Sequence, residues 1–125
     1  MRISRSTGYA LLALGYITEN QDQKIILSQT ISKEYDIPLE YLLKILQQMV
    51  RAGILRSKRG PRGGFSLNQS PKKISMLQIV EAVDGPMSGQ HTLFEAPVRG
   101  KFTNKVEAVY AKAVFDKAKM ADLIS

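Results

Sequence analysis

The chain has 125 residues, a formal net charge of +7 and no cysteine. This length predicts one domain with a modest core, and the lack of thiols excludes disulfides, thiolate-bound metals and cysteine catalysis. No apolar run approaches the ~20 residues of a membrane span, and the N-terminus lacks the pattern of a secretory signal, so we expect a cytoplasmic protein.

The positive charge is concentrated in the first part of the chain. Residues 1–75 hold twelve Lys and Arg against five Asp and Glu, whereas residues 76–125 hold six of each kind. Five cations fall within twelve residues that contain no acid: Arg51, Arg56, Lys58, Arg59 and Arg62. Such clustering predicts a polyanionic partner; a basic surface without any partner is the alternative.

The spacing of apolar residues predicts helices over Arg5–Thr18, Gln29–Tyr35 and 38–52. Ser28 is expected to cap the second of these helices. Proline ends one helix and fits the first turn of the next, so Pro38 predicts a short corner of the helix-turn-helix type. The buried stripe of the third helix is expected to be Leu42, Ile45, Leu46 and Met49.

A hairpin is predicted after the third helix. Two short apolar pieces, Ile54-Leu55 and Phe65–Leu67, flank Arg59–Gly64, a segment with three glycines, one proline and two arginines. This composition is typical of an extended tip rather than of a core. The short apolar run Lys24–Leu27 is compatible with a small strand. Helix, turn, helix and hairpin in this order predict a winged helix-turn-helix DNA-binding domain over residues 1–85, mainly α with a small β-hairpin.

A recognition helix brings the side chains of its first turns to base edges in the major groove. The candidates here are Glu40, Leu43, Lys44 and Gln47. A glutamate can accept from cytosine N4, and Lys44 or Gln47 can reach guanine or adenine, whereas Leu43 offers only apolar contact. Glu40 also has a second interpretation, since an acid at this position favours the start of a helix through the macrodipole.

The hairpin supplies a second set of candidate DNA contacts. The wing candidates are Arg56, Lys58, Arg59, Gly60, Arg62 and Gly63. An arginine at the tip can enter a narrow minor groove, and the glycines, Gly64 included, let the backbone approach a sugar-phosphate wall. A plain turn that needs positive φ is the alternative for one or two of these glycines. Phosphate contacts, which position a protein without reading sequence, are expected from Arg2, Arg51 and Lys72. The same role is expected of Arg56, Lys58 and Lys73.

A further helix is predicted over Ser75–Val83. Ser75 and Gln78 have the spacing of a capping box, in which each side chain satisfies the other residue's backbone donor. Residues 86–102 show no periodicity, and loops of this length in small proteins are generally functional or disordered. We therefore expect a sensory loop there.

The last predicted helix, Asn104–Leu123, is longer and more apolar than one small domain is expected to cover. Homodimerisation through residues 103–125 accounts for this surface; packing against its own domain is the alternative. The expected interface residues are Val106, Val109, Tyr110, Ala113 and Val114.

Five stretches carry a family resemblance: Met1–Ser4, Gly8–Leu11, Tyr41–Leu46, Ala52–Leu55 and Arg59–Phe65. Together with Ile74–Ile79 and Met120–Leu123, they resemble the Rrf-type transcription regulators, the family of the IscR, NsrR and CymR proteins. The resemblance covers nearly the whole chain. It implies a homodimeric, cytoplasmic bacterial regulator of a palindromic operator, with Glu40–Lys44 facing the major groove and Arg59-Gly60 the minor groove.

The chain also departs from that family's pattern. Many members bind an iron–sulfur cluster through three loop cysteines, and a chain without cysteine cannot hold a thiolate-ligated cluster. Another branch carries a histidine followed by Cys-Pro-Val-Gly; here His91 is followed by Ala96 at the position of that cysteine. Leu43 stands where members commonly have a glutamate that reads a base. His91 and Glu95, four residues apart, fall short of a metal site, so no metal or cofactor is expected.

Together these features predict a DNA-binding transcriptional regulator that receives its signal, from an unidentified small molecule or protein, through residues 86–102. We favour a repressor that binds double-stranded DNA as a homodimer. A protein-interaction module with weak DNA binding and a sequence-indifferent nucleic-acid-binding protein are the alternatives. No nucleophile–base pair or metal set stands out, so we expect no enzyme.

Overall fold

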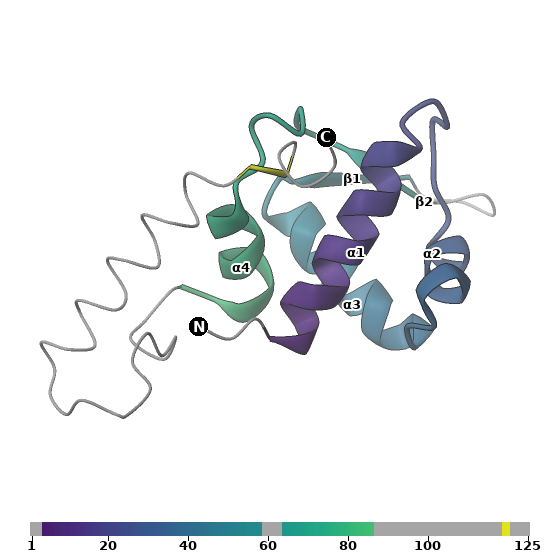
Figure 1. Cartoon of the computed structure of the whole chain (residues 1–125), viewed down its shortest axis with the longest axis horizontal. Helices are drawn as coiled ribbons and strands as arrows, with labels where there is room; N and C mark the ends of the chain where they lie inside the picture. The colour runs from purple at the N-terminus through teal and green to yellow at the C-terminus, as the bar shows by residue number, and fades with distance from the viewer. Residues whose placement is uncertain (1–3, 59–63, 87–118, 121–125) are drawn as a thin grey trace, which may run out of the picture.

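The computed structural model describes residues 4–58, 64–86 and 119–120. In chain order its elements are α1 (Arg5–Glu19), α2 (Ser28–Tyr35), α3 (Leu39–Arg51), β1 (Leu55–Lys58), β2 (Gly64–Leu67) and α4 (Met76–Asp84). Figure 1 shows α1 between α2 on one side and α4 on the other. This arrangement confirms the predicted fold, mainly α with a small β-hairpin.

The core lies where α1, α3 and α4 meet. Leu14 of α1 and Ile79 of α4 are fully buried in it. The stripe predicted for α3 is confirmed, because its buried residues are Leu42, Ile45, Leu46 and Met49. Gly53 follows α3 with a φ of +79°, the left-handed conformation in which helices commonly end.

The corner between α2 and α3 differs in detail from the sequence-based expectation. Pro38 is the N-cap of α3 and not part of its first turn, and Ile37 is buried beside it. The Ser32 hydroxyl donates to the Ile37 carbonyl over 2.6 Å, which holds the corner closed. The predicted Ser28 cap is wrong: Ser28 already has helical geometry, and the cap position is Leu27, without a side-chain hydrogen bond.

The hairpin pairs Leu55 with Leu67 at its base and Lys58 with Gly64 at its outer end. The strands extend beyond the apolar pieces seen in the sequence. Residues 56–58 of β1 are exposed, and they pair through the backbone with residues 64–66 of β2. The predicted small strand near residue 26 is a single bridge. Ile26 and Phe65 exchange two backbone hydrogen bonds of 2.9 Å, which fix the hairpin to the segment before α2.

Helix α4 begins with the predicted capping box. The Ser75 N–H donates to Gln78 Oε1 over 2.9 Å, and the Gln78 N–H donates to Ser75 Oγ over 3.1 Å. At the same end of α4, Lys119 forms a bridge with Ser75, and the Met120 N–H donates to the Ile74 carbonyl over 2.8 Å. The predicted helix Asn104–Leu123 is wrong at Lys119, because this residue forms a bridge. Apart from Lys119 and Met120, that predicted helix lies outside the described residues.

Candidate nucleic-acid interface

Three of the four major-groove candidates lie together on the solvent face of α3. Glu40, Lys44 and Gln47 are exposed, and their spacing of four and three residues places them on one side of a helix. Leu43 is half-buried and packs against the core. Its side chain therefore lies at the edge of this face, between the polar row and the buried stripe.

Sequence reasoning missed Tyr41, which belongs to the same first turns of α3. The residue is 39% exposed, and its hydroxyl is hydrogen-bonded to the Ser6 hydroxyl of α1. The ring of Tyr9 meets it edge-on, with 5.6 Å between centroids and an interplanar angle of 86°. These contacts tie the start of α3 to the first turns of α1. The sequence contained one signal for this role, since Tyr41 is an aromatic residue outside the apolar stripe of its helix.

On the wing, Arg56 and Lys58 are exposed on β1. Asn68, which follows β2, accepts from Arg56 Nε at Oδ1 over 2.6 Å and donates from Nδ2 to the Gly53 carbonyl over 2.9 Å. Gln69 also donates to that carbonyl, over 2.9 Å. The end of α3 thus holds Asn68, which in turn holds Arg56 by one edge of its guanidinium. Asn68 was not identified from the sequence, because only the folded hairpin brings it next to Arg56.

We expect Arg56→Ala to reduce the slope of log K against log salt concentration for duplex binding by about 1, since each phosphate contact releases about one counterion. Asn68→Ala keeps the charge but frees the guanidinium, so it should weaken binding less and leave the slope almost unchanged. Titrations of both variants at several salt concentrations measure this. An Arg56→Ala slope equal to that of the wild type would remove Arg56 from the phosphate contacts.

Gly64 has a different role from the one expected. A Cβ at this position would lie 2.5 Å from Ile25 Cγ2 and 2.6 Å from the Ile26 carbonyl oxygen. Glycine is therefore required for close approach between β2 and the segment before α2. The expectation that Gly64 helps the backbone approach a sugar-phosphate wall is wrong, because Gly64 is buried.

Of the other candidate residues, the structure describes only three. Arg51, the last residue of α3, and Lys72 and Lys73, between β2 and α4, are exposed. The following lie outside the described residues: Arg2, Arg59, Gly60, Arg62, Gly63, His91, Ala96, Val106, Val109, Tyr110, Ala113 and Val114.

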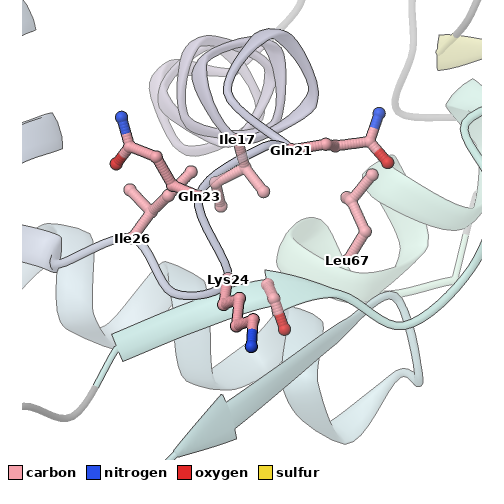
Figure 2. A pocket seen from close by; sticks show the side chains of 7 residues that line it. Ile17, Gln21, Gln23, Lys24, Ile26 and Leu67 are labelled. Carbon is pink, nitrogen blue, oxygen red and sulfur yellow. The ribbon is translucent and has the colours of Figure 1, made fainter.

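A small pocket lies beneath the wing, between the end of α1 and β2. Figure 2 shows Ile17, Gln21, Lys24 and Leu67 around it, and its volume is about 120 Å³. Pockets for drug-sized ligands span roughly 300–1,000 Å³. This pocket has room for a few water molecules, so we assign no ligand to it.

A larger groove of about 370 Å³ runs along the outer face of α1. Gly8, Leu12, Gly15, Tyr35 and Met120 are among the residues that line it, and Leu12 is 42% exposed. The groove is therefore an open apolar surface beside Met120. At its edge, burial raises the pKa of the Tyr35 phenol above its ordinary range, and neighbouring carboxylates add to this increase.

Comparison with known proteins identifies the family. The model of the Rrf2 family, described as iron-dependent transcriptional regulators, matches residues 3–124. The chain belongs to the Rrf2 family. This confirms the resemblance seen in the sequence.

Individual relatives are similar over part of the chain. An HTH-type transcriptional regulator of Aquifex aeolicus is 38% identical over 81 residues, which cover 65% of this chain and 56% of that protein. IscR of Cereibacter sphaeroides is 31% identical over 94 residues, which cover 74% of this chain and 61% of IscR. The chain therefore spans little more than half the length of these relatives.

Solved structures of the family share the fold. CymR, the global cysteine regulator of B. subtilis, superposes with a TM-score of 0.77 at 21% identity, over 99% of this chain and 96% of CymR. IscR of T. potens superposes with a TM-score of 0.72 at 19% identity, over 99% of this chain and 86% of that one. At these identities the likeness establishes the winged helix-turn-helix fold alone.

The family's description names iron, so the ligand set is relevant. Iron–sulfur clusters are held mainly by cysteine thiolates, and this chain has no cysteine and one histidine. The described residues contain no group of three or more His, Asp or Glu that could hold a metal ion. These residues do not fit a thiolate-ligated cluster. Among the same residues, no helix is long and apolar enough to span a bilayer.

Proposed function

We propose that this Rrf2 chain is a DNA-binding transcriptional repressor that reads a palindromic operator. The observation that carries the proposal is the exposed row Glu40, Lys44 and Gln47 on α3, together with the basic hairpin that follows this helix. Asn68 holds the hairpin to the end of α3 through the Gly53 carbonyl. In a winged helix-turn-helix this row enters the major groove and the wing contacts the adjacent backbone or minor groove.

The remaining contacts of the proposed interface follow from their places in the chain. The wing tip residues Arg59, Gly60, Arg62 and Gly63 would reach the minor groove. Arg51, Lys72 and Arg2 would contact phosphates, which fix the orientation of the protein without reading sequence. Leu43, at the edge of the α3 face, would offer a thymine methyl an apolar contact.

We also propose that the protein acts in the cytoplasm as a homodimer. In this proposal residues 1–85 bind DNA, residues 86–102 receive the signal and residues 103–125 form the dimerisation helix. The open apolar groove on α1, next to Met120, supports the proposal, because it leaves an apolar surface for a second copy beside the described part of residues 103–125. A two-fold symmetric dimer fits a palindromic operator, since each protomer can bind one half-site.

The dimer proposal predicts that the double substitution Val109→Asp and Val114→Asp yields monomers, because it would place two charges in an apolar interface. Sedimentation of the full chain measures this. Lys112→Asp, which changes a residue on the other side of the predicted helix, is the control and should remain dimeric. A dimer that persists in the double variant would contradict an interface through these valines.

Selection of genomic fragments tests the proposed function. The purified protein is mixed, with and without oxidant, with sheared genomic DNA of the organism that encodes it. The retained fragments are then sequenced. We expect one palindromic motif to be enriched, and its enrichment to change if the signal is oxidative. Retention of all fragments alike would favour a sequence-indifferent binding protein.

A further inference from the structure

Asp84, the last residue of α4, joins two helix ends that are distant in the sequence. Ser4 Oγ lies 2.8 Å from one of its carboxylate oxygens and 2.6 Å from the other. Thr7 Oγ1 donates to the second oxygen over 2.8 Å, and Thr7 is only 1% exposed. Two hydroxyl groups from the start of α1 therefore hold one carboxylate from the end of α4.

The start of α1 is a favourable place for this carboxylate. Ser4 is the N-cap of α1, and its Oγ accepts from the Thr7 backbone N–H over 3.0 Å. The first turn of α1 has no acid of its own, although a negative charge near a helix N-terminus is stabilising. Asp84 supplies that charge from another helix, so the two helix ends are coupled.

The same turns of α1 also hold the start of α3. The Ser6 hydroxyl is bonded to the Tyr41 hydroxyl, and the Tyr9 ring packs edge-on against the Tyr41 ring. Tyr41 follows Glu40 directly and precedes Lys44 by three residues. A continuous set of contacts thus runs from the end of α4, through the first turns of α1, to the part of α3 that bears the proposed base contacts.

Helix α4 is also where the C-terminal part of the chain departs and returns. Directly after Asp84, Gly85 has a φ of +85° and turns the chain away from the helix axis. The chain returns at Lys119 and Met120, which bond to the opposite end of α4. The described residues before position 87 and after position 118 therefore lie at opposite ends of α4, and Asp84 is at one of these ends.

We propose that Asp84 is a positioning residue for DNA reading: through Ser4 and Thr7 it sets the first turns of α1, and through Ser6 and Tyr41 these set the start of α3. The inference rests on the proposed function, because it assumes that α3 reads base pairs. It adds a residue that touches no DNA and yet determines how well the operator is distinguished from other DNA.

The two effects of removing the Asp84 charge have opposite signs. Loss of a negative charge strengthens attraction to every duplex alike. Loss of the clamp misplaces α3 and weakens binding to the operator only. The ratio of operator affinity to random-duplex affinity therefore separates positioning from charge, and it does not depend on how much of the sample is folded.

The experiment compares the full-length wild type with Asp84→Asn and Glu81→Gln, using the selected operator and a random duplex of equal length in a competition titration. Glu81 lies one turn earlier on α4, and its side chain has no hydrogen bond to α1 among the described residues. We expect Asp84→Asn to lower the affinity ratio by about fivefold or more, the scale of one impaired base contact. Glu81→Gln should leave the ratio unchanged.

Tyr41→Phe provides an independent variant, because it removes an exposed hydroxyl and leaves the core intact. It should lower the same affinity ratio. In the double variant with Asp84→Asn, the ratio should fall by less than the two single effects combined, since both substitutions interrupt one set of contacts. A ratio within about twofold of the wild type in Asp84→Asn would overturn the inference but leave the proposed function standing. A wild type without any preference for the operator would instead overturn the proposed function.

Discussion

Gly64→Ala should lower the free energy of unfolding by about 2 kcal/mol or more, within or above the usual range for overpacking a well-packed site. The new methyl group would overlap the Ile26 carbonyl oxygen, a backbone atom that cannot move away alone. Displacing it would break the two hydrogen bonds between Ile26 and Phe65 that fix the hairpin. Chemical denaturation of the full chain measures the loss.

Gly8→Ala is the matched control for this change. A Cβ at Gly8 meets no atom within 4 Å, and alanine is favoured over glycine inside a helix by up to about 1 kcal/mol. Gly8→Ala should therefore leave the free energy of unfolding unchanged or raise it. A Gly64→Ala variant as stable as the wild type would show that the hairpin is not held at Ile26 in the way described.

The second large effect is expected from Lys44→Ala. Loss of one good side-chain contact to a base costs about 1–3 kcal/mol of discrimination, and Lys44 lies in the middle of the exposed row on α3. Operator binding should weaken by about tenfold, and random-duplex binding should weaken much less. Fluorescence anisotropy titrations against both duplexes measure the two affinities.

Lys33→Ala is the control for Lys44→Ala, because Lys33 is also exposed but lies on α2. Its loss removes the same charge without removing a proposed base contact. It should weaken binding to both duplexes equally. Equal losses on the two duplexes for Lys44→Ala as well would assign Lys44 to the phosphates and not to the bases.

The features that sequence reasoning predicted well are those that depend on neighbouring residues. Helical periodicity gave the buried stripe of α3, and the Ser75–Gln78 spacing gave a capping box that is present in the structure. The Ser28 cap failed because a cap position depends on backbone angles, and the backbone at Leu27 is the last extended part before α2. The outer part of β1 carried no apolar signal, because backbone pairing holds its exposed residues.

The features that were missed depend on residues far apart in the chain. Asp84 reaches Ser4 across 80 positions, and Arg56 reaches Asn68 across the hairpin. Gly64 shows the same limit. Glycine is required there because the backbone of Ile26 lies too close for a side chain, and not because of the hairpin turn. For the candidate site, the sequence predicted the polar row of α3 but not the contacts that position it. The roles of these residues in DNA binding stay predictions.

The central claim is that this Rrf2 chain holds one palindromic sequence far more tightly than other DNA. Competition between the selected palindrome and a random duplex, at one stated salt concentration, tests it most directly. We expect a preference of about 10³-fold or more, with two protomers bound to each palindrome. Equal affinity for the two duplexes would contradict it.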